Sequence, residues 1–115
     1  MFVHLALPPD GRKPRKHQDV IGRAIRQRAP QVVGDVSRDA DYHADVAGTR
    51  SEMVIPLLEG GAVLGAVDFQ SQEPGAFDLD DVAAGEVLAE FLVVALRNAR
   101  LYKETRPRGG PGEPA

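Results

Sequence analysis

The stretch RSEMVIPLLEGGAVLGAVDFQS, residues 50–71, decides the fold. It holds two apolar runs, Glu52 to Leu58 and Val63 to Ser71, with the connection Glu59-Gly60-Gly61 between them. A glycine-rich connection of this length is typical of a β-hairpin, because glycine tolerates the positive φ angles that such turns require. The sequence therefore predicts two antiparallel strands joined by a tight turn.

Both predicted strands are apolar on both faces. Because side chains alternate along a strand, Met53, Ile55 and Leu57 point one way. Val54 and Leu58 point the other way. A half-solvated sheet would alternate between apolar and polar residues, so we expect a cover on each side of the hairpin.

Two pairing registers are compatible with the hairpin. A loop of Gly60-Gly61 alone places Glu52 opposite Phe69, whereas a loop of Glu59-Gly60-Gly61 places Glu52 opposite Asp68 on the same face. A slip of one residue exchanges the two faces. Only the second register pairs the two acids directly, and two close carboxylates either raise one pKa or capture an amine or a cation.

The rest of the chain predicts an α+β fold with an antiparallel sheet, a short helix and a long C-terminal helix packed on one face. Pro56 lacks an N–H group and favours a sheet edge or a bulge at its position. The segment from Val36 to Arg50 is expected to be a long polar loop, and loops of that length are often binding loops. The expected elements are a strand from Phe2 to Leu7, a helix capped by Asp19 and stopped by Pro30, a strand from Gln31 to Val33, a polar loop from Val36 to Arg50 and a helix from about Leu79 to Lys103.

The C-terminal helix is apolar nearly all round, since Phe91 to Leu96 are six consecutive apolar residues. Such a helix is buried on more than one side. The sheet can cover one apolar stripe, and a second stripe then needs a second helix or a second subunit. One stripe consists of Leu88, Phe91, Leu92, Ala95, Ala99 and Tyr102; the other, spaced by seven and predicted as a dimer interface or a surface for a signalling partner, consists of Val87, Val94 and Leu101.

Composition excludes several classes of function. The 115 residues bound the chain to one domain, and the net charge of −3 gives no indication of nucleic-acid binding. The chain has no cysteine, which removes disulfides, thiolate metal sites, a cysteine nucleophile and thioether-linked chromophores such as bilins. The apolar runs are too short to cross a membrane. We therefore expect a cytoplasmic protein without membrane contact.

The order of several short motifs resembles the GAF domain family. These motifs are IGRAI, VVGDV, RSE, GxxxGAVD, F-x-x-x-D and NARLY, and the match covers residues 19–104. The chain is most similar to the GAF modules of bacterial sensor histidine kinases and related signalling proteins. Because the family usually has a helix and a strand before the position of Phe2, we interpret residues 1–104 as a partial, N-terminally truncated GAF-like domain, followed by a disordered tail at 105–115.

The resemblance implies a small-molecule sensor whose pocket lies on the sheet face away from the terminal helices, under the long loop. A carboxylate at Asp68, between Val67 and Phe69, is costly to bury without a partner. Two explanations of Asp68 stay open, namely hydrogen bonds to the backbone and contact with a ligand. At Asp35 and Arg50 a structural role is favoured over ligand binding. The candidate ligand-binding residues are Asp35, Tyr42, Arg50, Ser51, Glu52 and Asp68.

The resemblance also limits the chemistry. The family branch that reduces free methionine sulfoxide holds its substrate with a similar SE and LD pattern but needs cysteines, so we expect no reductase activity here. The sequence also shows no nucleophile, metal set or paired acid and base at fixed spacing, so we predict that this chain is not an enzyme. Recognition of an amine-bearing molecule stays open. No signature for cyclic nucleotides is evident, no histidine pair has metal-ligand spacing, and we interpret His43 as a solvated loop residue rather than a haem ligand.

Two functions follow from this sequence. The first is a sensory or regulatory domain that binds an unknown small molecule and transmits a signal through its C-terminal helix. The second is a ligand-free dimerisation module in which the two helical stripes are the function.

Overall fold

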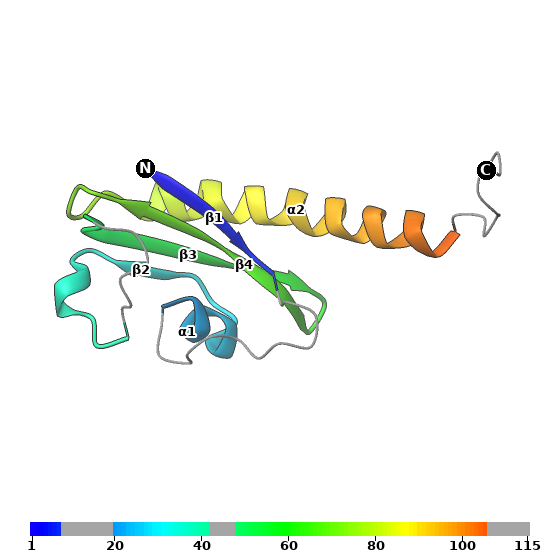
Figure 1. Ribbon diagram of the computed structural model, residues 1–115, viewed down its shortest axis with the longest axis horizontal. Coiled ribbons are helices and arrows are strands. Elements are labelled where there is room, and N and C mark those ends of the chain that lie inside the picture. Colours follow the sequence, from blue (N-terminus) through cyan, green and yellow to red (C-terminus); the bar gives the residue numbers. More distant parts are fainter. Residues whose placement is uncertain (8–19, 42–47, 106–115) are drawn as a thin grey trace.

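The computed structural model describes residues 1–7, 20–41 and 48–105 (Figure 1). Tyr42, His43, Asp19 and the tail from residue 106 onward lie outside these described residues. The described elements are β1 (Phe2–Ala6), α1 (Val20–Gln27), β2 (Gln31–Val33), the 3-10 helix η1 (Val36–Arg38), β3 (Ser51–Glu59), β4 (Ala62–Ser71) and α2 (Leu79–Thr105). The strands form one antiparallel sheet in the order β1-β4-β3-β2, which confirms the predicted α+β fold.

The two helices lie on opposite faces of the sheet (Figure 1). Alternate residues of β3 and β4 therefore enter two separate apolar cores, as the two-sided strands predicted. The core under α2 contains Met53, Ile55, Leu57, Val67, Phe69, Ala89 and Val93. The core under α1 contains Val20, Ala24, Val33, Val36, Val54 and Ala66.

The hairpin turn is Gly60-Gly61, because Glu59 pairs with Ala62. The ladder then slips by one residue, because Leu57 pairs with Gly65 while Leu58 pairs with Val63. Leu64 is thus an extra residue on β4, which is a β-bulge.

The bulge makes both predicted registers wrong. Beyond it Glu52 lies opposite Gln70, not Phe69 or Asp68. Sequence reasoning missed the bulge because apolar residues run through it without a break in pattern. Pro56 lies next to the bulge and beyond the end of β2, whose pairing with β3 stops at Val54, so the prediction of an edge or a bulge at Pro56 is confirmed.

The end of β1 passes close to Gly65 of β4. The φ angle of Gly65 is +155°, and a Cβ there would collide with the carbonyl oxygen of Ala6 and with the side chain of Leu7. Any other residue would push β1 off the sheet edge.

Helix α2 begins with a reciprocal cap between Asp78 and Asp81. The Asp81 N–H donates to Asp78 Oδ1 (3.0 Å), and the Asp78 N–H donates to Asp81 Oδ2 (2.9 Å). The first of these bonds holds the pKa of Asp78 below its ordinary value. The cap fixes the start of the helix where the sequence predicted it.

The stripe of α2 that faces the sheet is neither of the two predicted stripes. It contains Val82, Gly85, Ala89, Leu92, Val93 and Leu96. Gly85 selects this stripe, because it has no side chain and lets the helix lie close to β3. A Cβ at Gly85 would lie 3.0 Å from Ile55 Cγ1. Because larger apolar residues occur on all sides of α2, the sequence alone could not select the face that packs on the sheet.

The residues of the two predicted stripes are mostly exposed. Phe91 keeps 69% of its surface exposed, Val87 54%, Leu101 47% and Val94 45%. No helix in residues 1–7, 20–41 or 48–105 is long and apolar enough to span a membrane.

Candidate functional site

A row of buried polar side chains crosses the α1 face of the sheet. Glu52 of β3 lies opposite Gln70 of β4, and Asp68 shares the face with Gln70 because it lies two residues away. Their exposed fractions are 4% for Glu52, 3% for Gln70 and 0% for Asp68. We call Glu52, Asp68 and Gln70 the polar row.

Hydrogen bonds organise one side of this row. Gln70 Nε2 donates to Asp68 Oδ2 at 2.7 Å, and Thr49 Oγ1 donates to Gln70 Oε1 at 2.7 Å. The other carboxylate oxygen, Asp68 Oδ1, is buried and accepts no hydrogen bond from the part of the chain that the structure describes. Because a buried carboxylate is costly without partners, this oxygen marks a place for a donor.

The second acid of the row adds negative charge. Glu52 is the diagonal neighbour of Asp68 across β3 and β4, and such neighbours have Cα atoms about 7–8 Å apart. Carboxylates at this spacing favour a positively charged group between them. Among the described residues, no three histidine or acidic side chains gather as they would around a metal ion.

His4 approaches the same row from β1. It lies directly opposite Asp68 on the same face, with its ring exposed and 6.3 Å from that of Phe2. The imidazole therefore stands at the open border of the polar row, near the acid but not hydrogen-bonded to Asp68 Oδ1.

Asp35 is placed as a helix cap. Its Oδ1 accepts hydrogen bonds from the Ser37 hydroxyl (2.6 Å) and the Ser37 N–H (3.1 Å), and these hold its pKa below the ordinary value. Arg38 Nε lies 3.4 Å from Asp35 Oδ2. These contacts account for Asp35 as the N-cap of η1.

Arg50 and Ser51 also make structural contacts. The Arg50 backbone bridges two segments, since its N–H donates to the Ser71 carbonyl and its carbonyl accepts from Val36 N–H. The Ser51 hydroxyl donates to the Glu73 carbonyl (2.6 Å) and accepts from Ala76 N–H (3.3 Å), which pins the turn before α2. Ser51 lies on the face opposite the polar row.

Of the five candidates within the described residues, the structure brings together Glu52 and Asp68, and it adds three residues that sequence reasoning did not include. These are Gln70, Thr49 and His4. A signal for Gln70 was present, because a polar residue two positions from Asp68 on a strand shares its face. Thr49 and His4 could not be found without the pairing of β1, β3 and β4.

Arg23 of α1 fixes the loop beside this face. It binds both oxygens of Asp39 at 3.0 Å, Asp41 Oδ2 at 3.0 Å and Gln31 Oε1 at 2.9 Å. The hydrogen bond with Arg23 is the largest cause that holds the pKa of Asp39 below its ordinary value. The Arg23 side chain is only 21% exposed.

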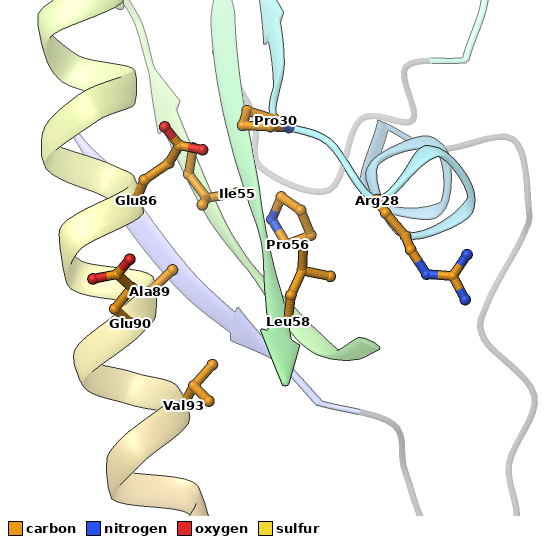
Figure 2. Close-up of a pocket in the computed structure, with 9 residues that line it drawn as sticks. All are labelled: Arg28, Pro30, Ile55, Pro56, Leu58, Glu86, Ala89, Glu90 and Val93. Atoms are coloured by element: carbon orange, nitrogen blue, oxygen red, sulfur yellow. The ribbon is translucent and has the colours of Figure 1, made fainter. Parts of the chain in front are cut away.

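A separate groove of about 200 Å³ lies at the open edge of β3, where β2 has ended (Figure 2). Its floor is apolar, with Ile55, Pro56 and Val93. Figure 2 shows Glu86 and Glu90 on the α2 side and Arg28 on the α1 side. None of the five candidate residues within the described part of the chain lines it.

Comparison with known proteins identifies the family. A family model described as a GAF domain matches residues 4–97, and the chain belongs to this family. GAF domains are typically regulatory or sensory domains. The four-stranded antiparallel sheet with a long C-terminal helix is a GAF-like fold.

Two curated relatives contain similar segments. A probable 3',5'-cyclic phosphodiesterase from Caenorhabditis elegans is 32% identical over an alignment of 73 residues, which covers 59% of this chain and 10% of that protein. GAF domain-containing protein A from Dictyostelium discoideum is 33% identical over 64 residues, which are 56% of this chain and 40% of that protein. The chain thus spans less than half of either relative, and the bacterial sensor context stays a prediction.

A solved structure shows the same fold together with an activity. The free methionine-R-sulfoxide reductase of Neisseria meningitidis, in complex with its substrate, is 28% identical, with a TM-score of 0.74 over 86% of this chain and 68% of that one. The prediction that this chain is not an enzyme was therefore wrong as an inference, because reductases are among its structural neighbours. The absence of cysteine bears on thiol chemistry alone, and the lack of a recognisable nucleophile, metal set or acid–base pair in the sequence does not exclude other catalysis.

Proposed function

We propose that this chain is a sensory GAF domain of a signalling protein that binds a small molecule through an ammonium group at the polar row. The observation that carries the proposal is Asp68 Oδ1, a buried carboxylate oxygen without a donor among the described residues. An ammonium group supplies both the missing donor and the balancing charge. Glu52, on the diagonal, adds a second negative charge for the same group.

The reductase from Neisseria meningitidis supports this ligand class. Its substrate, free methionine sulfoxide, is an amino acid and so carries an α-ammonium group. At 28% identity the likeness does not name a ligand for this chain, but it shows that a GAF fold of this shape accommodates a free amino acid. We extend the class, rather than the particular molecule, to this protein.

A path from the site to α2 exists in the alternation of the strands. Met53 follows Glu52, and Phe69 lies between Asp68 and Gln70, yet both apolar side chains pack in the core under α2. A ligand that draws β3 and β4 together at the polar row therefore moves the surface on which Gly85 of α2 rests. A signal results only if the ligand binds one helix arrangement more tightly than another.

Thermal unfolding with matched compounds tests the proposal. Among a panel of free amino acids that includes methionine sulfoxide, we expect at least one to raise the melting temperature at saturation by about 5 °C or more. The N-acetyl derivative of that compound, which lacks the ammonium charge, should have no effect. Asp68→Asn should abolish the shift, whereas Glu90→Gln, which removes a carboxylate from the groove instead, should preserve it.

Two results would overturn the proposal. One is an equal response to the free and the acetylated compound, and the other is an unchanged response in Asp68→Asn. A panel without any shift would favour the second candidate function, an interaction module. That candidate has its own support, since Phe91, Val87 and Leu101 of α2 are about half exposed or more.

A further inference from the structure

Thr49 links the loop before β3 to the polar row. Its hydroxyl donates to Gln70 Oε1 at 2.7 Å, and Gln70 Nε2 donates to Asp68 Oδ2 at 2.7 Å. The three side chains thus form one chain of hydrogen bonds from the loop end to the buried carboxylate. Consecutive hydrogen bonds of this kind strengthen one another where water is excluded.

The backbone directly after Thr49 is held by two other segments. The Arg50 N–H donates to the Ser71 carbonyl at 2.7 Å, and the Arg50 carbonyl accepts from the Val36 N–H at 3.0 Å. Arg50 is therefore tied to the end of β4 and to the start of η1. The place of the Thr49 hydroxyl thus depends on how this loop end lies against both elements.

The amide of Gln70 has one orientation that satisfies both of its neighbours. An ionised carboxylate only accepts hydrogen bonds, so Nε2 faces Asp68 and Oε1 faces away from it. The Thr49 hydroxyl supplies the donor that Oε1 needs on that outer side. Held at both ends, the amide stays on Asp68 Oδ2 and leaves Asp68 Oδ1 without a donor among the described residues.

Loss of the Thr49 contact changes this division of the carboxylate. Gln70 is only 3% exposed, so its Oε1 has little access to water as a replacement donor. A buried acceptor without a donor is unfavourable, which allows the amide to leave its present position. Its Nε2 can then donate to Asp68 Oδ1, since both oxygens belong to one carboxylate. An internal donor on Oδ1 competes with an ammonium group for that oxygen.

We propose that Thr49 is a positioning residue that keeps the polar row open for its ligand and so places the site under control of the loop. With the hydroxyl on Gln70, Asp68 Oδ1 is reserved for the ligand. With the hydroxyl withdrawn, Gln70 occupies Oδ1 and the site is closed. By linkage, a ligand on Oδ1 stabilises the loop end in its present place as much as the loop end favours the ligand.

This inference rests on the proposed ammonium site and adds its regulation. The two can fail separately, because the position of the Gln70 amide can be observed without a ligand. Binding of an amino acid by the wild type can also be measured without any change at Thr49.

A crystal structure of ligand-free Thr49→Val tests the position of the amide. Valine has nearly the shape of threonine but no hydroxyl. We expect Gln70 Nε2 to lie within about 3.2 Å of Asp68 Oδ1 in this variant. Thr49→Ser, which keeps the hydroxyl, should retain the wild-type bond to Oδ2. An unchanged Gln70 amide in Thr49→Val would overturn the proposal.

Affinity for a free amino acid is the functional readout. The probes are methionine sulfoxide and the other amino acids of the thermal panel, titrated calorimetrically into the full chain. We expect the dissociation constant to rise about tenfold in Thr49→Val, roughly the effect of one hydrogen bond. Thr49→Ser should restore it. Thr105→Val, the same substitution at the end of α2, where Thr105 Oγ1 donates to the Leu101 carbonyl, should have no effect.

A double-mutant cycle tests whether Thr49 acts through Gln70. In Gln70→Leu no amide can reach Asp68 Oδ1, so adding Thr49→Val should not weaken binding further. A further loss of affinity in the double variant would overturn the proposed route. Circular dichroism confirms that each variant is folded.

The outcomes separate the two claims. A wild type that binds no amino acid of the panel overturns the ammonium site and its regulation together. Equal dissociation constants in the wild type and Thr49→Val overturn the regulation alone. A loss of affinity that Thr49→Ser does not restore also overturns it, because the methyl group rather than the hydroxyl would then be responsible.

Discussion

The two faces of one pair of strands differ in chemistry. On the α2 face, β3 and β4 present only apolar side chains in the sheet centre, with Met53, Ile55 and Val67 almost fully buried. On the α1 face, the same strands bury Glu52 and Asp68. Neighbouring residues on one strand thus serve opposite purposes. The apolar face is optimised for packing, and the polar row retains a burial cost that packing alone does not require.

The largest expected effect breaks the apolar face. Val67→Asp introduces a carboxylate into the core under α2, one residue away from Asp68 of the polar row. Val67 is only 2% exposed, and the described side chains that form this core are apolar. We expect the free energy of unfolding to fall by about 3–5 kcal/mol, measured by urea denaturation. A loss below about 1 kcal/mol would mean that the two faces are equivalent.

An intermediate effect concerns the loop that borders the α1 face. Arg23→Met keeps the aliphatic stem of Arg23 but removes four hydrogen bonds, so Asp39 and Asp41 lose their partner. We expect a loss of about 2 kcal/mol at neutral pH. Arg38→Met is the matched control, because the Arg38 side chain is 85% exposed, and it should change stability by less than about 1 kcal/mol.

The pH dependence sharpens the same prediction. Because Arg23 lowers the pKa of Asp39 in the folded state, this pair stabilises the fold above the ordinary carboxyl pKa of about 3.9. The contribution is lost as the pH falls through the lowered pKa of the folded state. Arg23→Met should therefore show a flatter decline of stability in acid than the wild type. Parallel acid profiles would contradict the role of Arg23.

The smallest expected effect has the opposite sign. Asp68→Asn removes a buried charge while its side-chain oxygen can still accept from Gln70 Nε2. Without ligand, we expect the free energy of unfolding to rise by about 1 kcal/mol, because an unpaired buried carboxylate destabilises the fold. A clear loss of stability would show that Asp68 is a structural residue and would weaken the functional interpretation of the polar row.

The sequence predicted the elements better than their pairing. The hairpin, the two-sided cover, α1 and the start of α2 all follow from local patterns such as Gly60-Gly61 and the Asp78 cap. The bulge at Leu64 does not, since it depends on how β3 and β4 fit together. That single residue changed the partner of Glu52 and so the composition of the site.

The site itself was predicted in part for the same reason. Asp68 stood out as a charge among apolar residues, and Glu52 as the acid at the start of a strand. The roles of Asp35 and Ser51 in a cap and a turn depend on backbone groups that are distant in sequence or hidden in local geometry. The face of α2 on the sheet was set by the small side chains of Gly85 and Ala89, which no apolar count selects.

The most direct measurement of the central claim is a crystal structure of the chain with the free amino acid that gives the largest thermal shift. The account predicts the ammonium nitrogen within about 3.2 Å of Asp68 Oδ1. The Gln70 bond to the other oxygen should be retained. An ammonium group bound in the groove beside Glu86 and Glu90, with Asp68 Oδ1 unchanged, would contradict the account.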